Sequence, residues 1–332
     1  MSNGLSHSPR TWQLLAMLGD GKFHSGEVLA NRLGISRASV FNALANVAEY
    51  DVVLQRIRGR GYRLARPWQR LDTAEITRCL GQGASQFEIE ILPQASSSNA
   101  LLLQRARSSK EEVSSGSVLA VELQTAGRGR MGRVWHSGLG SSLTFSLLWR
   151  FACGLNALSG LSLAVGVAQI RTLKKLGSQN VYLKWPNDIM TSQGKLGGVL
   201  IEAQGDMLGP CTVVIGIGLN YSLPATLVKK IDQAACALDD ICTSMPTRSK
   251  LLAMLLQELV DVLKQFEKSG FALLRTEWES YHIHQNRKIM IQVPQGKSCS
   301  GFARGVNDRG ELYLETKQGS KYFNSGEIGE KL

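Results

Sequence analysis

The sequence lacks the patterns that mark several common classes of protein. Its six cysteines include no CxxC pair, and no histidine cluster lies near them, so we expect neither a disulfide framework nor a zinc site. His282 and His284 lie two residues apart without a third ligand, and we expect them to be ordinary surface residues. The most apolar run, LSGLSLAVGVAQI, is shorter than the ~20 residues of a membrane-spanning helix, and the N-terminus shows no signal-peptide pattern. These absences favour a reduced, soluble, cytoplasmic protein with no membrane partner.

Motifs of several nucleotide-binding and hydrolytic enzymes are also missing. The phosphate-loop motif GxxxxGK(S/T) does not occur, which excludes a P-loop nucleotide site. The segment GIGLN, residues 216–220, lacks the third glycine of GxGxxG, and no helical pattern follows it directly, which argues against a Rossmann site. The nucleophile motif GxSxG is absent as well. The remaining candidates for chemistry are basic segments rich in glycine.

The chain as a whole is basic. Its 332 residues include 38 lysines and arginines against 27 acidic residues, a formal net charge of +11. Such a charge indicates an anionic partner, such as a nucleic acid or a nucleotide, but an enzyme with an incidentally basic surface would look the same. The length suggests two or three domains.

Residues 1–66 predict a small helical unit. After the apolar helix TWQLLAML, Ser25 and Ser36 can cap two further helices, GEVLANRL and RASVFNALANV, and Gly34 suits the turn between them. The shared apolar face consists of Leu29, Leu33, Ile35, Val40 and Ala43, with Ala30 small where the helices cross. A plain helical hairpin is the simpler alternative, but the combined pattern favours a helix-turn-helix.

A basic hairpin follows these helices. The segment VVLQRIRGRGYRLAR, residues 52–66, has strand character around two glycines and carries five arginines and no acid. Residues 1–66 carry nine basic against four acidic side chains, a net charge of +5. A recognition helix followed by a basic hairpin is typical of a winged helix-turn-helix that binds DNA phosphates. The expected DNA-binding residues are Ser36, Arg37, Ala38, Ser39, Asn42, Arg58 and Arg60.

Residues 67–270 alternate strand and helix patterns. Strands are expected at FEIEIL, SVLAVELQ, SSLTFSLLW, VYLKW, GGVLIEA and CTVVIGIGL, with VYLKW and GGVLIEA joined as a hairpin through TSQG. Helices are expected from near Asn99, over 158–177 and over 249–270. Hairpins mixed with helices favour an α+β domain with a mixed sheet over a doubly wound one.

Residues 271–332 begin with a short helix, ALLRTEWESY. Strands are expected at KIMIQV, CSGFARGV, ELYLET and KYFNSGE, with turns at PQGK, NDRG and KQGS. This spacing predicts a small β-barrel of the SH3-like kind. We therefore expect a multidomain α+β protein with domains at 1–66, 67–270 and 271–332.

Cations gather in three segments of the central region. They are Arg128, Arg130 and Arg133 in QTAGRGRMGRVW, Lys184 in KWPND, and Lys195 in GKLGG. Arginine forks and lysine charges bind carboxylates and phosphates, and the glycines let backbone N–H groups approach an anion closely. A reaction that joins two anions needs such a set, for example the attack of a carboxylate on the α-phosphate of ATP, with Asp188 placed to hold Mg²⁺. For the arginine loop alone, a solvated basic loop or a further nucleic-acid contact is an equally good interpretation.

Four ordered motifs, AGRGRMGRVW, KWPND, GKLGGVLIE and GIGLN, resemble those of the biotin protein ligases. With the N-terminal winged helix, the chain resembles the bifunctional biotin ligases that also repress the biotin operon, over essentially its whole length. The resemblance implies a central mixed α/β ligase domain of the class II synthetase-like type. It implies that biotin and ATP, with Mg²⁺, form biotinyl-5′-adenylate, and that biotin then passes to a lysine of a biotin carboxyl carrier protein. It also implies binding to operator DNA, repression of biotin biosynthesis, and a homodimer when biotinyl-adenylate is bound.

The same resemblance implies roles for individual residues. Those implied to bind biotin are Ser97, Ser98, Asn99, Gln124, Arg128, Gly129, Arg130 and Lys195, and those implied to bind the nucleotide are Arg128, Arg130, Asn187 and Asn220. The implied catalytic residues are Lys195, Arg130, Lys184 and Asp188, with Asp188 also the metal ligand. One feature departs from the family. Its repressor members carry a tryptophan that covers adenine after the last motif, but YSLPATLVKKIDQAACAL has none, which leaves the cover of adenine open.

Two other functions fit parts of the pattern. Lipoate ligases have a similar fold and a key lysine, but the full GRGRxG loop and the winged helix favour biotin. A ligand-sensing repressor without ligase activity is the second alternative, and the intact cationic set argues against it.

Overall fold

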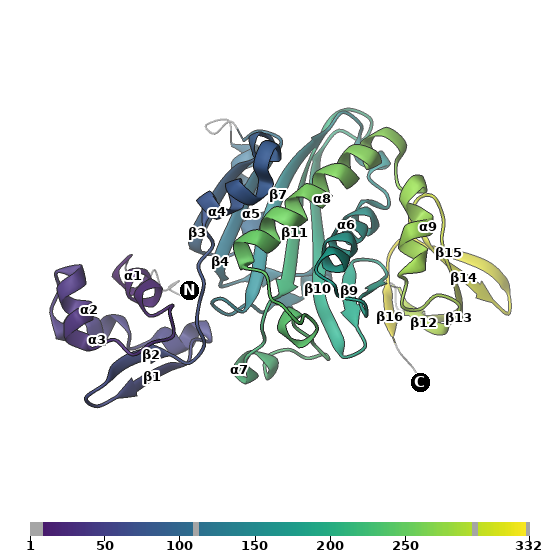
Figure 1. The fold of residues 1–332 in the computed structure, drawn as a ribbon. Helices are drawn as coiled ribbons and strands as arrows, with labels where there is room; N and C mark the ends of the chain where they lie inside the picture. Colours follow the sequence, from purple (N-terminus) through teal and green to yellow (C-terminus); the bar gives the residue numbers. More distant parts are fainter. Residues whose placement is uncertain (1–8, 109–112, 294–297, 330–332) are drawn as a thin grey trace.

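The structure is a computed structural model that describes residues 9–108, 113–293 and 298–329. Along the chain, a small helical part leads into a large sheet covered by helices and then into a small sheet (Figure 1). The N-terminal elements are α1 (Pro9–Met17), α2 (Gly26–Leu33), α3 (Arg37–Ala43), the 3-10 helix η1 (Val47–Tyr50), β1 (Leu54–Ile57) and β2 (Gly61–Leu64). Strands β1 and β2 pair as an antiparallel hairpin, as the sequence predicted.

The expected caps of α2 and α3 are confirmed. The hydroxyl of Ser25 accepts from the backbone of Val28 at 3.1 Å, that of Ser36 accepts from Ser39 at 3.0 Å, and Gly34 ends α2 with a φ of 62°. Helix α3 ends earlier than expected, at Ala43, and the chain then turns into η1. The carbonyl of Leu44 accepts from Arg56 of β1 at 2.7 Å. This backbone group is therefore bonded to the hairpin, not to a further helical turn.

The central sheet is mixed, as expected. Its strands are β3 (Glu88–Ala95), β4 (Ser117–Gln124), β7 (Ser142–Phe151), β8 (Tyr182–Lys184), β9 (Asp188–Thr191), β10 (Gly194–Gly205) and β11 (Cys211–Asn220). Their order is β3-β4-β7-β11-β10-β9-β8, and among the described strands only β3 and β4 run parallel. The expected hairpin between VYLKW and GGVLIEA was wrong, because β9 lies between them and pairs with both.

Helices cover both faces of this sheet. One face is covered by α5 (Ser98–Arg107), and the other by α4 (Thr73–Leu80), α6 (Leu161–Lys175) and α8 (Arg248–Ser269). The same part of the chain contains α7 (Ala225–Val228) and the short 3-10 turns η2 (Gly81–Gln86), η4 (Leu155–Ala157) and η5 (Leu238–Asp240), and α9 (Ala272–Ser280) follows α8. Alternate residues of β4 enter different cores: Val118 and Ala120 pack with α6 and α8, whereas Leu119 and Val121 pack with α5. No helix within the described ranges is long and apolar enough to cross a membrane.

The C-terminal part is a five-stranded antiparallel sheet. Its strands are β12 (Lys288–Gln292), β13 (Ser298–Val306), β14 (Leu312–Thr316), β15 (Gly319–Phe323) and β16 (Glu327–Gly329), in the order β15-β14-β13-β12-β16. The expected single strand KYFNSGE is split, because the chain leaves β15 after Phe323 and β16 returns to pair with β12. The turn expected at PQGK lies outside the described residues. Apolar residues of this sheet share one core with α9 and the central sheet.

The expectation that His282 and His284 are surface residues was wrong. They are 5% and 4% exposed, in the chain that follows α9. The ring of His282 stacks on Trp278 with centroids 4.6 Å apart, and its Nδ1 lies 3.3 Å from the carbonyl oxygen of Leu183. Burial lowers the pKa of His282 to about 3. These residues belong to the packing between α9 and the sheet.

The N-terminal part rests on the end of β4. Leu123 and Leu139 pack into the N-terminal core, and the indole N–H of Trp68 donates to Glu122 at 3.2 Å. Glu122 also forms a fully buried ion pair with Arg248 of α8. The carboxylate further accepts from the backbone of Leu71, and Arg248 donates to the carbonyl of Ser142. Gln124, the next polar residue along β4, therefore lies close to this boundary.

Candidate active site

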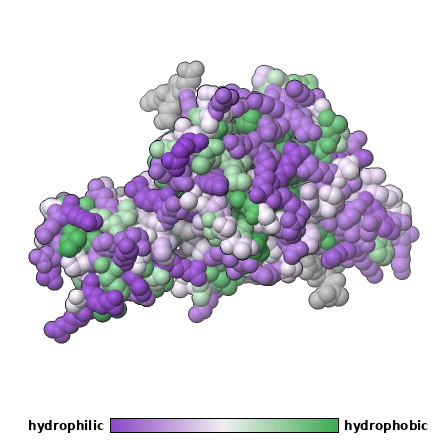
Figure 2. Space-filling model, in the orientation of Figure 1, coloured by the Kyte–Doolittle hydropathy of each residue, from purple (hydrophilic) through white to green (hydrophobic). Residues whose placement is uncertain are grey.

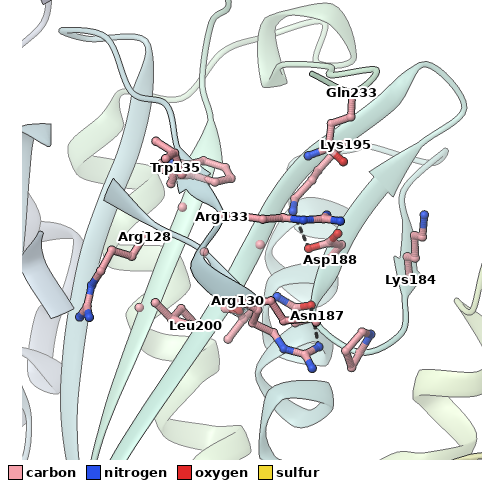
Figure 3. A pocket seen from close by; sticks show the side chains of 18 of the residues that line it. Arg128, Arg130, Arg133, Trp135, Lys184, Asn187, Asp188, Lys195, Leu200 and Gln233 are labelled. Carbon is pink, nitrogen blue, oxygen red and sulfur yellow. Dashed lines mark hydrogen bonds and ion pairs between the residues drawn. The ribbon is translucent and has the colours of Figure 1, made fainter. Parts of the chain in front are cut away.

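One cavity of about 610 Å³ opens over the ends of β10 and β11. One wall comes from the N-terminus of α5. The others come from the hairpin of β5 (Gly127–Arg128) and β6 (Val134–Trp135) and from the turn before β9, which carries Asn187 (Figure 3). The structure brings eleven of the predicted site residues to it. They are Ser97, Ser98, Asn99, Gln124, Arg128, Gly129, Arg130, Lys184, Asn187, Asp188 and Lys195.

A hydrogen-bonded polar network forms one end of the cavity. The backbone N–H and the hydroxyl of Ser98 donate to Oε1 of Gln124 at 2.7 and 3.1 Å. The hydroxyl of Ser146, on β7, reaches both Ser98 and Asn99. Asn99 in turn donates to the carboxylate of Glu202 at 3.1 Å. Because Ser97, Ser98 and Asn99 are each 4% exposed, their polar atoms are fixed in direction, which suits recognition of a small polar ligand.

The glycines of GIGLN form the floor of the cavity. A Cβ atom on Gly216 would lie 2.2 Å from Oδ1 of Asn99, and one on Gly218 would lie 2.6 Å from the indole of Trp135. Both strand positions therefore need glycine because side chains from other elements lie directly over them.

The arginine-rich segment, which the sequence analysis treated as a loop, is a hairpin in the structure. Gly127 and Arg128 pair with Trp135 and Val134, and the N–H of Gly129 donates to the carbonyl of Arg133 at 2.7 Å. Met131 at the tip has a φ of 54°, in the left-handed region that non-glycine residues rarely adopt. This geometry fixes the directions in which the hairpin arginines leave the backbone.

The three arginines have different partners. Arg128 contacts Glu202 at 2.7 Å and points away from the other cations in Figure 3. Arg130 donates to Oδ1 of Asn187 at 3.3 Å. Burial lowers the pKa of the Arg130 guanidinium, and the carboxylates of Asp188 and Glu327 act in the opposite direction.

Lys195 and Asp188 form an ion pair inside the cavity. Nζ of Lys195 lies 2.7 Å from Oδ1 of Asp188, and the two side chains are 16% and 19% exposed (Figure 3). Asn187 holds the preceding turn against β10, since its side chain donates to the carbonyl of Val199 at 2.8 Å. Lys184 also lines the cavity, but Figure 3 shows its amine on the far side of the turn from this ion pair.

Asn220 is the exception among the predicted ligand-binding residues. It does not line the cavity that the described residues form. Its side-chain amide donates to the backbone carbonyls of Lys195 and Cys236, at 3.2 and 3.1 Å, and the residue is 4% exposed. It thus ties the chain after β11 to the start of β10.

Several cavity residues escaped the sequence interpretation. Trp135 was part of the quoted loop, but no role was given to its ring, which covers Gly218. Lys230, Asp232 and Gln233 come from the segment after α7. The C-terminal sheet contributes Gln292 and residues 326–329, and Glu327 pairs with Arg133. Only the three-dimensional fold brings these distant segments to one cavity.

The residues around Asp188 could hold a metal ion only with help from water and substrate. No group of three or more histidine, cysteine or acidic residues suited to a metal occurs among the described residues. Magnesium usually takes one or two protein carboxylates and completes its shell with water and substrate phosphates. The single carboxylate of Asp188, which lines the cavity, fits a site of this kind.

The N-terminal residues expected to bind DNA are accessible. Ser36, Arg37, Ala38 and Asn42 are exposed, Ser39 is half-buried, and Arg58 and Arg60 lie exposed at the hairpin turn. Arg60 stacks on the ring of Phe23 at 4.4 Å. Phe41, which the sequence interpretation did not select, is 51% exposed on α3, with Arg56 over its ring at 4.9 Å. Figure 2 shows hydrophilic residues along the outer end of this part.

Comparisons of the chain with known proteins agree on one family. The profile of the biotin/lipoate A/B protein ligase family matches residues 92–220. The chain is 35% identical to the bifunctional ligase/repressor BirA of Escherichia coli over 316 residues, 95% of each chain. It is 30% identical to the biotin–[acetyl-CoA-carboxylase] ligase of Mycobacterium tuberculosis over 75% of this chain and 91% of that protein. The biotin protein ligase of Aquifex aeolicus, solved in complex with biotin and ATP, matches with a TM-score of 0.60 and 26% identity, covering 73% of this chain and 97% of that one.

The ligase/repressor relative therefore aligns with nearly the whole chain, and the ligases align with about three quarters of it. The chain belongs to the biotin/lipoate A/B protein ligase family, among its bifunctional ligase/repressor members.

Proposed function

We propose that this protein activates biotin with ATP and transfers it to a lysine of a biotin carboxyl carrier protein. A carboxylate oxygen of biotin attacks the α-phosphorus of ATP, and pyrophosphate leaves, which gives biotinyl-5′-adenylate. The carrier lysine amine then attacks the acyl carbon, AMP leaves, and the nitrogen loses a proton. The relatives reported above are biotin ligases or ligase/repressors, which favours biotin over lipoate.

Residues of the polar network bind biotin in this proposal. Ser97, Ser98, Asn99 and Gln124 surround one end of the cavity with fixed donors and acceptors, as a ureido group requires because it both donates and accepts. Arg128, Gly129 and Arg130 close the side of the cavity above the ligand. The biotin carboxylate then lies toward Lys195.

Charge neutralisation is the main catalytic contribution of the protein. Two anions must meet, and Lys195 and Arg130 lower their repulsion without having to reorganise, while Lys184 adds positive charge to the cavity from the far side of the turn. Lys195 is already held by Asp188, and Arg130 by Asn187, so both charges are in place before substrates arrive. Asp188 would hold Mg²⁺, which supplies further neutralisation of the triphosphate when it is bound.

The ring of Trp135 offers the adenine surface that the sequence left open. It lies on Gly218 and borders the cavity, and a flat aromatic face suits stacking by a purine. Asn220 supports this region from behind through its contacts with Lys195 and Cys236. We therefore propose that Asn220 acts on the nucleotide site by positioning its walls, together with Arg128 and Arg130 as phosphate contacts.

We also propose that the N-terminal part is a winged helix-turn-helix of residues 1–66 that binds operator DNA and represses biotin biosynthesis. Its recognition helix is α3 and its wing is the β1–β2 hairpin, with Arg58 and Arg60 at the phosphates. Residues 67–270 form a ligase domain of the class II synthetase-like type, and residues 271–332 an SH3-like domain. A homodimer that forms with biotinyl-adenylate presents two DNA half-sites. Alignment of nearly the whole chain with a ligase/repressor supports this arrangement.

The observation that carries the ligase proposal is the convergence of the polar network with Arg130, Lys184 and the Lys195–Asp188 pair on one cavity. Isotope exchange between pyrophosphate and ATP tests it. Exchange should require biotin and should not occur with lipoate. Exchange with lipoate alone would favour the lipoate ligase, and exchange with neither acid would leave a ligand-sensing repressor.

A further inference from the structure

The N-terminal part contacts the wall of the substrate cavity through one ion pair. Asp51 follows η1, and its two carboxylate oxygens lie 2.8 and 2.9 Å from Nζ of Lys230. Lys230 belongs to the segment after α7 and lines the cavity. The Asp51 side chain is only 9% exposed, whereas that of Lys230 is 48% exposed. Water therefore screens the carboxylate of this pair less than the carboxylate of an ordinary surface pair.

The backbone holds Asp51 firmly in position. Its φ of 59° is in the left-handed region, which aspartate tolerates better than most residues. The carbonyl of Tyr50 accepts from Leu139 at 3.3 Å. A Cβ atom on Gly138 would lie 3.2 Å from Cβ of Asp51, so Gly138 packs directly against the Asp51 side chain. The carboxylate is thus presented from a fixed point at the boundary between the two parts.

The segment that carries Lys230 also holds the catalytic lysine. The N–H of Lys195 donates to the carbonyl of Ala234, and that of Cys236 donates to the carbonyl of Lys195, both at 2.9 Å. Gln233 of the same segment lies beside Lys195 in Figure 3 and lines the cavity. Displacement of residues 229–236 would therefore loosen the cavity wall and the backbone around Lys195, whereas Nζ of Lys195 stays paired with Asp188.

A second cavity, of about 310 Å³, lies at this boundary. Its lining includes Asp51 from the N-terminal part, and Gln124, Trp135 and Lys230, which also line the substrate cavity. Side chains do not fill the space behind the substrate site here, so the ion pair bridges a gap. Its loss would leave the segment less constrained on that side.

We propose that Asp51, a residue of the DNA-binding part, is a positioning residue of the ligase site. Through Lys230 it holds residues 229–236 against the cavity and so slows the departure of the bound adenylate. The inference rests on the proposed function, because it takes biotinyl-adenylate as the ligand. Removal of the Asp51 charge should weaken retention of the nucleotide and leave the chemical step intact.

The test compares full-length Asp51→Asn with the wild type. Asparagine keeps the size and the left-handed backbone of Asp51 and removes only its charge. We expect the off-rate of biotinyl-adenylate and the KM for ATP to rise about fivefold, at the low end of measured couplings between sites, with kcat unchanged. Lys230→Met should raise the same two quantities. The double variant, Asp51→Asn with Lys230→Met, should raise them no further than either single variant. Lys230→Arg keeps the charge and should behave as the wild type. Asp308→Asn, which breaks the Arg275–Asp308 pair of 2.8 Å on the exterior, is the matched control and should change nothing.

Hydrogen exchange of the ligand-free protein tests the positioning without any reaction. The amides of Lys195 and Cys236 should exchange faster in Asp51→Asn than in the wild type and in Asp308→Asn. Equal exchange and an equal adenylate off-rate would overturn the proposal. Faster exchange in a protein that does not adenylate biotin would uphold the positioning role and refute the proposed ligand.

Discussion

Replacement of Lys195 by alanine tests the charge arrangement of the cavity most sharply. Lys195 lies 2.7 Å from Asp188, and both side chains are largely shielded from water. Truncation removes the positive charge that faces the biotin carboxylate and the α-phosphate. It also leaves the Asp188 carboxylate without its partner, beside two further anions.

The expected loss can be worked from these two effects. Removal of one preorganised electrostatic group typically costs ~10²–10³-fold in rate. The uncompensated carboxylate of Asp188 acts in the same direction, so we expect adenylation to fall toward the upper end of that range. The cost to folding should be small, on the order of 1 kcal/mol, because the pair lines an open cavity, where water can reach the Asp188 carboxylate once the lysine is truncated.

Biotin-dependent pyrophosphate exchange measures the loss, and thermal unfolding confirms that the variant is folded. Lys195→Arg keeps the charge and should retain more activity than Lys195→Ala, which separates charge from mere side-chain volume. A folded Lys195→Ala protein with wild-type exchange would refute the role of this lysine. Equal losses in both variants would show that the shape of the lysine matters, not its charge.

Other perturbations test the remaining parts of the account. Arg130→Gly removes a half-buried guanidinium that is bonded to Asn187. It should speed the release of the adenylate, measured by stopped flow, more than it weakens the binding of biotin to the ligand-free protein. An unchanged off-rate would count against a closing role for the hairpin. Removal of Arg58 and Arg60 together should flatten the plot of log K for DNA binding against log salt concentration, by up to ~2 in slope at ~0.9 per phosphate contact. A wild-type slope would mean that the hairpin does not touch phosphate. Because His282 has a pKa of about 3 when folded and roughly 6.5 when unfolded, the unfolded state binds more protons between these values. Stability should therefore fall as pH drops from 6.5 toward 3, by at most about 4–5 kcal/mol from this group. His282→Phe should flatten that dependence in denaturant titrations, and an unchanged profile would assign the acid sensitivity elsewhere. Biotin plus ATP should raise the affinity of the dimer in sedimentation, and by linkage operator DNA should raise it too, with a coupling of ~1–3 kcal/mol. Equal dimer dissociation constants with and without biotin plus ATP would leave a ligase with an uncoupled DNA-binding part.

Local chemistry explains what could be predicted from the sequence. Capping by Ser25 and Ser36 and the glycine turn at Gly34 depend on neighbours within a few residues, and all three occur as expected. The cationic segments could also be found, because glycines and basic residues near strand ends already limit what they can bind. Arg128, Arg130, Lys184 and Lys195 line one cavity, as this reasoning implied. Ser97, Ser98, Asn99 and Gln124 line it too, but they were expected there only from the family resemblance.

The features that the sequence did not reveal arise from contacts between distant segments. Glu327 reaches Arg133 only because β16 returns to pair with β12. Gly216 and Gly218 look like flexible strand residues until Asn99 and Trp135 are placed over them. His282 lies in a polar stretch, YHIHQNRK, whose composition suggests exposure, but Trp278 and Leu183 bury it. In each case the deciding partner lies on another element.

The central claim is that this cavity makes and holds biotinyl-5′-adenylate. Native mass spectrometry of the protein, after incubation with equal amounts of biotin and lipoate together with ATP and Mg²⁺, tests it most directly. We predict one retained ligand with the mass of biotinyl-adenylate in the wild type, and much less of it in Lys195→Ala. A retained lipoyl-adenylate, or no retained acyl-adenylate from a folded wild-type protein, would contradict the claim.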